Sequence, residues 1–156
     1  MALGERANEW RSPMTVPARV SLVTLGVDDV ARATDFYRRL GWEVSPVSGP
    51  QVTFLRTAGS LLALFGTADL AADAGLAPPE GEGFRGVSLA INVASPQEVD
   101  EALADVEAAG GRVLRPAGPA DWGGYLGYFS DHDGHVWEVA HNPGFPLGED
   151  GLPRLP

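Results

Sequence analysis

The sequence predicts an α+β fold built from two βαβββ modules, and three observations carry this prediction. At two places, residues 19–41 and 87–111, a segment whose apolar residues alternate as in a β-strand is followed by one whose apolar residues have the period of an α-helix. After each helix come short β-rich segments separated by turn residues. Between the two copies, residues 67–84 include Pro78, Pro79 and several glycines, a composition typical of a linker.

The length and composition of the chain fit a globular protein. Its 156 residues suffice for one domain or for two half-domains that share a core, and 44% of them are hydrophobic. The formal net charge is -10 and all 11 basic residues are scattered arginines, which argues against nucleic-acid binding because a phosphate backbone needs clustered cations. The sequence has no cysteine and no apolar run long enough for a signal segment or a membrane span. We therefore expect a cytoplasmic protein with no nucleic-acid or membrane partner.

The first module is expected at residues 18–67, after an irregular N-terminal arm at 1–17 that shows no periodicity. Asp28 or Asp29 can cap its helix, and Gly41 offers the left-handed conformation that ends it. The expected strands are Arg19–Val27, Trp42–Val47, Gln51–Arg56 and Ser60–Phe65.

The second module is expected at residues 85–143, between a linker at 68–84 and a tail at 144–156 that is rich in Gly and Pro. Its helix has a strong start signal, because Ser95 can be the N-cap and Glu98 can complete a capping box. Gly110 follows the last apolar position of the helix and ends it. The expected strands are Val87–Val93 and Arg112–Arg115, followed by a loop at Pro116–Asp121 and a hairpin at Trp122–His141.

The hairpin turns at Asp131–Gly134, where Asp and Gly supply the hydrogen bonding and positive φ of a tight turn. Alternation in its second strand puts Glu138 on one face and Trp137, Val139 and His141 on the other. A carboxylate in the middle of an apolar strand is costly unless it faces water, a partner or a ligand. Glu138 is therefore a remnant of a metal site, a general base or hydrogen-bond acceptor for a ligand, or the partner of a nearby arginine.

Two motifs, taken with the module order, resemble the vicinal oxygen chelate superfamily. They are Asp29-Val30-(x)5-Phe36-Tyr37-(x)2-Leu40-Gly41 and Asp131-x-Asp133-Gly134-x-x-Trp137-Glu138. This superfamily includes glyoxalase I, extradiol dioxygenases, fosfomycin-resistance enzymes and bleomycin-binding proteins, and the resemblance covers residues 19–143. It implies paired half-barrels (the glyoxalase/bleomycin resistance/dihydroxybiphenyl dioxygenase-like fold), with helices on the convex side and a ligand or divalent metal in the concave bowl. It also implies a homodimer.

In metal-dependent members of the superfamily, the metal ligands lie on the first and fourth strand of each module. Alignment of the motifs carries these positions onto Leu22, Ala63, Ser88 and Glu138. Only Glu138 has a donor of the kind that divalent transition metals prefer, since leucine and alanine have none and serine is a poor neutral donor. We therefore expect no cofactor and no divalent metal.

The three histidines of the sequence do not supply the missing donors. His132 falls in the turn, and alternation puts His135 and His141 on the face opposite Glu138. The histidines are therefore expected in the turn and on the convex side.

Alternation also puts the four carried-over positions on the same side as Thr24, Ala90 and Asn92, so the bowl is expected to have mainly small and apolar walls. Aromatic rings at the mouth of such a bowl would contact a flat hydrophobic ligand, although some of them could instead fill the core. The expected ligand-binding residues are Leu22, Thr24, Phe54, Ala63, Phe65, Ser88, Asn92, Trp122, Tyr125, Tyr128 and Glu138. The aromatic residues assigned to the core are Phe36, Tyr37, Trp42 and Trp137.

These observations lead to one preferred function and two alternatives. The preferred function is a metal-free binding protein for an aromatic or hydrophobic small molecule, as in the drug-sequestering, bleomycin-resistance-like members of the superfamily. The first alternative is an enzyme of the glyoxalase, dioxygenase or isomerase type, with Glu138 as base or residual metal ligand. The second is a structural or regulatory dimer with an empty bowl.

Overall fold

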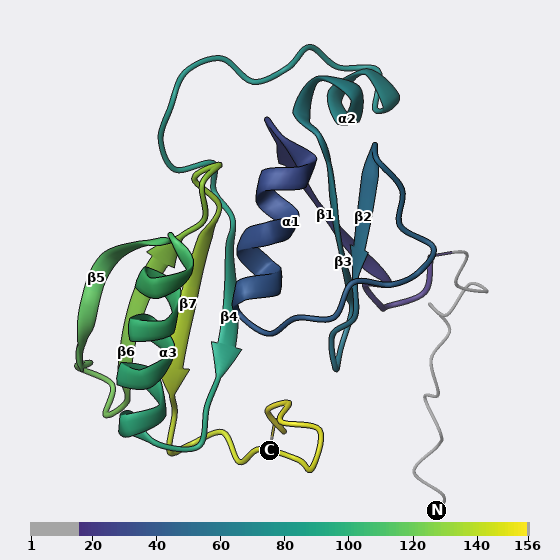
Figure 1. Cartoon of the computed structure of the whole chain (residues 1–156). Helices are drawn as coiled ribbons and strands as arrows, with labels where there is room; N and C mark the ends of the chain where they lie inside the picture. Colours follow the sequence, from purple (N-terminus) through teal and green to yellow (C-terminus); the bar gives the residue numbers. More distant parts are fainter. Residues whose placement is uncertain (1–15, 156) are drawn as a thin grey trace, which may run out of the picture.

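The computed structural model describes residues 16–155, so the arm predicted at 1–17 lies almost wholly outside the described residues. Within them the chain forms a three-stranded sheet in the order β1-β3-β2 and a four-stranded sheet in the order β4-β7-β6-β5 (Figure 1). The elements are β1 (Leu22–Val27), α1 (Val30–Arg39), β2 (Val52–Leu55), β3 (Leu61–Gly66), α2 (Thr67–Asp73), β4 (Ser88–Asn92), α3 (Pro96–Ala109), β5 (Arg112–Pro119), β6 (Tyr125–Ser130) and β7 (Val136–His141). The predicted α+β class and the repeat of a strand-helix-strand unit are confirmed.

The first sheet differs from the prediction in one strand. The segment Trp42–Val47 makes only an isolated bridge, between Val44 and Leu55. The physical reason is Pro46, which has no N–H to donate and cannot continue a ladder. β2 pairs antiparallel with β3, and β1 pairs parallel with β3 on its other side.

The second sheet differs in the length of β5. The predicted strand ended at Arg115, but β5 continues through most of the predicted loop to Pro119. Its register against β6 shifts on both sides of Arg115, so Pro116 lies at a bulge on an edge strand, where a missing N–H is tolerated. In the predicted linker, α2 is a short helix of seven residues.

The helices begin at the predicted caps. The Asp29 side chain accepts a hydrogen bond from the Arg32 N–H, and the Ser95 side chain accepts one from the Glu98 N–H. The Glu98 carboxylate accepts a hydrogen bond from the Ala94 N–H at 2.9 Å. The expected capping box therefore forms, but with the N–H of the residue before the N-cap in place of the N–H of Ser95. Gly110 ends α3 with a φ of +99°, in the left-handed region that favours glycine.

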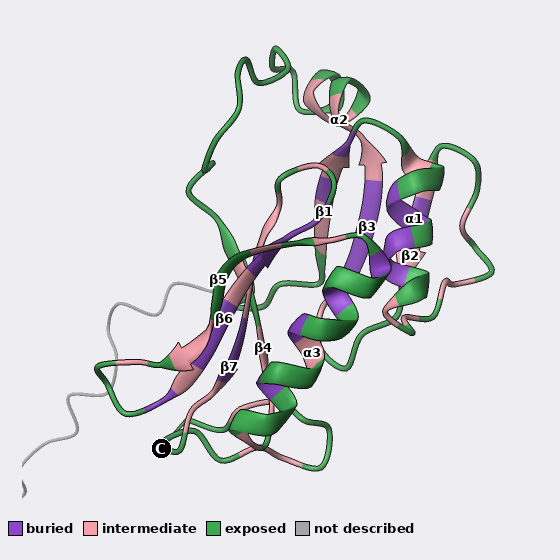
Figure 2. Ribbon diagram, turned by 60° about the vertical axis from the view of Figure 1, so that its left-hand side comes forward, coloured by how far each residue is buried: buried purple, intermediate pink, exposed green. Residues whose placement is uncertain are grey.

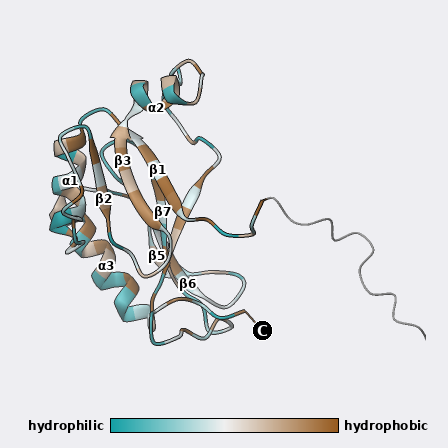
Figure 3. Cartoon of the chain, turned by 90° about the vertical axis from the view of Figure 1, so that its right-hand side faces the viewer, coloured by the Kyte–Doolittle hydropathy of each residue, from teal (hydrophilic) through white to brown (hydrophobic). Residues whose placement is uncertain are grey.

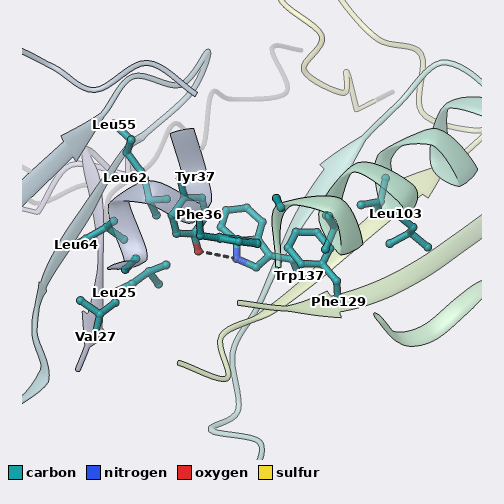
Figure 4. Close-up of a cluster of buried hydrophobic side chains, with 14 of the residues drawn as sticks. Leu25, Val27, Phe36, Tyr37, Leu55, Leu62, Leu64, Leu103, Phe129 and Trp137 are labelled. Carbon is teal, nitrogen blue, oxygen red and sulfur yellow. Dashed lines mark hydrogen bonds between the residues drawn. The ribbon is translucent and has the colours of Figure 1, made fainter. Parts of the chain in front are cut away.

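One hydrophobic core joins the two modules. Both α1 and α3 lie on the same side of the strands (Figure 3), and the buried stripes of both helices face inward (Figure 2). Phe36 and Tyr37 from α1 meet Phe129 and Trp137 from the second sheet in the middle of the core (Figure 4). These positions confirm the predicted core aromatics; Trp42, also predicted there, is partly buried against the same cluster.

Polar contacts reinforce the junction between the modules. The buried Tyr37 hydroxyl donates to Asp131 Oδ2 at 2.8 Å and accepts from the Trp137 indole N–H at 3.3 Å (Figure 4). The other Asp131 oxygen accepts the backbone N–H groups of Asp133 and His135 and so fixes the hairpin turn. Burial, followed by the neighbouring Asp131 charge, raises the pKa of Tyr37 far above its ordinary value. The hydroxyl therefore stays protonated and remains a donor.

Among residues 16–155, no helix has both the length and the apolar character needed to cross a membrane.

Candidate functional site

The candidate site is the face of the two sheets that points away from α1 and α3, which we call the open face (Figure 3). Strand alternation assigns residues to it, because Leu25, Val27, Trp137 and Val139 belong to the core on the helix side. The side chains between them therefore point the other way. The edge strands β1 and β4 of the two sheets approach each other, since Leu25 and Leu89 line the same small cavity.

The first sheet contributes five of the predicted ligand-binding residues to the open face. The register aligns Thr24 with Ala63 and Ala63 with Phe54 across its three strands. Leu22 and Phe65 occupy the neighbouring rows on the same face. Ala63 itself is buried, as a small side chain on the central strand between larger neighbours. This half of the face is apolar apart from one threonine hydroxyl.

The second sheet contributes Ser88, Asn92, Tyr128 and Glu138. The first two lie on the edge strand β4, and Glu138 lies opposite both Ala90 of β4 and Tyr128 of β6. The predicted positions from both modules thus share the face that the helices leave uncovered. The first sheet has the small and apolar side chains expected from alternation, whereas the predicted residues of the second sheet are polar.

Glu138 is paired with a tyrosine. The Tyr128 hydroxyl donates a hydrogen bond to Glu138 Oε2, and none of the ion pairs among the described residues includes Glu138. Of the three interpretations of Glu138, pairing with an arginine is not seen among the described residues, where a tyrosine hydroxyl is the donor to this carboxylate. That hydrogen bond, with burial, raises the pKa of Tyr128, while the positive charge of Arg115 works in the opposite direction.

The four positions carried over from metal-dependent members of the superfamily do not fit a metal. Leu22 and Ala63 offer no donor atom, Ser88 offers a neutral hydroxyl, and Glu138 already accepts from Tyr128. A divalent transition metal needs several nitrogen, sulfur or carboxylate donors. Within residues 16–155, no three His, Asp or Glu side chains come together in a way that could hold a metal ion.

One of the predicted aromatic ligand-binding residues, Tyr125, lies on the other face of the sheet. Tyr125 points to the helix side, where its hydroxyl donates to Asp100 of α3 at 2.8 Å. The expectation that it accompanies Tyr128 is corrected, because residues three apart in a regular strand lie on opposite faces. Trp122 lies in the connection between β5 and β6, is 54% exposed, and its ring covers Gly124.

The histidines lie away from the open face. The His132 ring packs edge-on against Phe36 at 5.4 Å between ring centroids, and His141 Nδ1 lies 3.3 Å from the Val93 carbonyl oxygen. His135 bridges the modules, with Nε2 at 2.7 Å from the Gly26 carbonyl oxygen and Nδ1 at 3.3 Å from the Arg85 guanidinium. The cavity beside it is about 30 Å³, which is room for water but not for a drug-sized ligand.

Sequence reasoning missed Arg115, which the register places opposite Tyr128. It also missed the Tyr128–Glu138 pair, although the tight turn at Asp131–Gly134 carries enough information to set that register.

The fold and the arrangement of this face define the class of protein. The chain belongs to the Glyoxalase/Bleomycin resistance protein/Dioxygenase superfamily, whose sequence model matches residues 19–139. The predicted family is thereby confirmed.

Solved structures agree with this assignment. The chain is 36% identical to a glyoxalase-related enzyme from Fulvimarina pelagi, with a TM-score of 0.81, and the match covers 89% of this chain and 99% of that chain. It is 27% identical to a lactoylglutathione lyase from Agrobacterium tumefaciens, with a TM-score of 0.62 and coverage of 81% and 96%. TioX from Micromonospora sp. ML1, at 24% identity, a TM-score of 0.57 and coverage of 78% and 97%, shares the fold. A comparison with curated proteins finds no match.

Proposed function

We propose that this chain is a cytoplasmic small-molecule-binding protein that holds an aromatic or hydrophobic molecule on its open face without a divalent metal. The observation that supports the proposal is the make-up of that face, where the apolar side chains of the first sheet accompany the polar pair of Glu138 and Tyr128 on the second sheet. Apolar walls with a few placed polar groups are typical of small-molecule sites. Sequestration of an antibiotic, as in the bleomycin-binding members of the superfamily, is the specific form of this proposal.

A pair of tryptophan variants tests where the ligand binds, with 2-naphthol as a neutral aromatic probe and calorimetry as the readout. Ala90 is exposed and lies beside Glu138 in register, so Ala90→Trp should fill the site without disturbing the core and weaken binding at least about tenfold. Ala31 is exposed on the outer side of α1, and Ala31→Trp should bind like the parent chain. Equal affinities for the two variants, or no saturable binding to the parent, would reject the proposal.

The metal-free part of the proposal has its own test. Because a metal that binds only the folded state raises thermal stability, titration with Zn²⁺, Mn²⁺, Fe²⁺, Co²⁺ or Ni²⁺ should leave the melting temperature unchanged. A saturable rise that Glu138→Ala removes would show that a metal site exists around this carboxylate.

A second copy of the chain is proposed to complete the site. Leu22 and Leu61, which pair in register at one end of the first sheet, are 40% and 44% exposed, and apolar groups that lie together on a surface mark contact sites. Light scattering should give twice the chain mass of 16.4 kDa. Leu61→Glu should halve that mass, whereas Leu76→Glu, at an exposed linker position, should not. A parent chain that is monomeric at high concentration contradicts this part.

An enzymatic role is the second candidate, and the Tyr128–Glu138 pair is the observation that favours it. One Glu138 oxygen accepts from Tyr128, and the other could take a proton from a carbon beside a carbonyl and return it, as isomerisation requires. Incubation with hydroxyacetone in deuterated water would show this as deuterium uptake that Glu138→Gln abolishes. Uptake equal in parent and variant would count against it.

A further inference from the structure

One polar row crosses the open face of the second sheet. The register sets Ala90, Glu138, Tyr128 and Arg115 side by side on its four strands. Tyr128 donates its hydroxyl hydrogen to Glu138, and Arg115 is the register partner of Tyr128 on the neighbouring strand, which puts the two side chains on the same face. Tyr128 therefore lies between a carboxylate residue on one neighbouring strand and an arginine on the other.

Neither charged group is neutralised within the described part of the chain. The ion pairs there join Arg38 to Asp35, Arg56 to Glu43 and Arg154 to Asp150. Arg115 makes no side-chain hydrogen bond among these residues, and the second Glu138 oxygen has no donor there. An arginine on an edge strand also discourages strand pairing with other molecules, but that role does not require a carboxylate and a hydroxyl in the same row.

The spacing of the strands suits a compact ligand with two charges. Neighbouring strands lie about 4.8 Å apart, so Arg115 and Glu138 start from backbones about 10 Å apart, and both side chains extend toward the hydroxyl between them. A carboxylate is a strong acceptor for an ammonium group, and a guanidinium can bind a carboxylate through two parallel hydrogen bonds. Ala90, at the far side of Glu138 from Tyr128, leaves space for an apolar body.

From this geometry we infer that the row recognises an amino-acid-like zwitterion, with an ammonium group at Glu138, a carboxylate at Arg115 and an aromatic or apolar body beside Ala90. This inference rests on the proposed binding function and names the chemical class of the ligand. The ligand's two charges replace the water that solvates Glu138 and Arg115 in the free protein, so one charge alone leaves the opposite group of the row without a partner.

Three probes that share one phenyl ring test the inference: phenethylamine carries only the cation, phenylacetate only the anion, and L-phenylalanine both. Binding to the full chain is followed by backbone amide NMR, with 2-naphthol as the neutral reference. L-phenylalanine should bind at least about tenfold more tightly than either singly charged probe. Glu138→Gln should lower its affinity to that of phenylacetate, and Arg115→Ala to that of phenethylamine. Arg39→Ala removes the same charge from an exposed position of α1 and should change nothing.

The possible outcomes distinguish failure of the zwitterion inference from failure of the proposed binding function. If 2-naphthol binds the open face but the three charged probes bind equally, the zwitterion inference is overturned and the binding function stands. The inference is also overturned if L-phenylalanine binds best but Arg39→Ala weakens its binding as much as Arg115→Ala does. If no probe, including 2-naphthol, shifts residues of the open face, both the inference and the binding function fail.

Discussion

Replacing Tyr37 by Phe removes a single oxygen atom from the buried contact that joins the two modules. Tyr37 is 0% exposed and its partner Asp131 is 6% exposed, so water cannot take the place of the lost hydroxyl. The change leaves Asp131 Oδ2 without its donor at 2.8 Å and the Trp137 indole N–H without its acceptor at 3.3 Å.

The cost of Tyr37→Phe follows from these two hydrogen bonds. A hydrogen bond to a charged group contributes about 1.5–3 kcal/mol and a neutral one about 0.5–1.5 kcal/mol, so the variant should lose roughly 2–4 kcal/mol of unfolding free energy. For a chain of this size each kcal/mol shifts the melting temperature by about 2–4 °C, which gives a decrease of roughly 5–15 °C.

The control is Tyr125→Phe, which removes the same atom from an exposed hydrogen bond to Asp100. Its melting temperature should stay close to that of the parent chain, because water replaces the lost partner. Urea denaturation at neutral pH, followed by both fluorescence and circular dichroism, measures the two variants. If Tyr37→Phe is no less stable than Tyr125→Phe, the Tyr37–Asp131 contact does not hold the modules together.

Three further variants test other parts of the fold. Ser95→Ala removes the N-cap of α3 and should cost about 1 kcal/mol in urea denaturation; no change would mean that the cap is dispensable. Gly127→Ala places a Cβ 2.4 Å from Leu103 Cδ1 and 3.0 Å from the Arg115 backbone oxygen, and because the backbone of β5 cannot move aside as a side chain can, it should lower the melting temperature by several degrees; an unchanged value would contradict the packing. Burial raises the pKa of Asp133 above its ordinary value, so the folded chain prefers the protonated acid and loses stability as pH rises from about 4, the unfolded value, through the raised pKa. Asp133→Asn has no buried carboxylate to ionise, so the melting temperature of the variant should rise relative to that of the parent chain between about pH 4 and about pH 7. A variant whose melting temperature falls relative to the parent's over this range would contradict the raised pKa of Asp133.

Much of the fold could be predicted from local patterns. Two amphipathic helices, their caps and the Asp131–Gly134 turn follow from short-range chemistry that tertiary packing does not override. Strand alternation also correctly puts Glu138 and Trp137 on opposite faces of the sheet, since side chains alternate between the two faces of a regular strand.

The errors have physical causes that local patterns do not contain. The strand predicted at Trp42–Val47 is reduced to one bridge because Pro46 interrupts it. β5 extends past Pro116 because bulges on an edge strand accommodate a proline. Those same bulges decide that Arg115 faces Tyr128, so the complete polar row could not be read from the sequence. The error at Tyr125 has another cause. Strand alternation, which places Glu138 correctly, is sufficient to predict that Tyr125 and Tyr128 lie on opposite faces.

Binding of a small aromatic molecule to the open face is tested most directly by an amide NMR map of 2-naphthol bound to the full chain. We predict saturable shifts clustered at Thr24, Ala63, Ala90 and Glu138, with the outer surfaces of α1 and α3 unaffected. Shifts that cluster instead around His135 and the small cavity between the modules, or that never saturate, would contradict the proposed binding function.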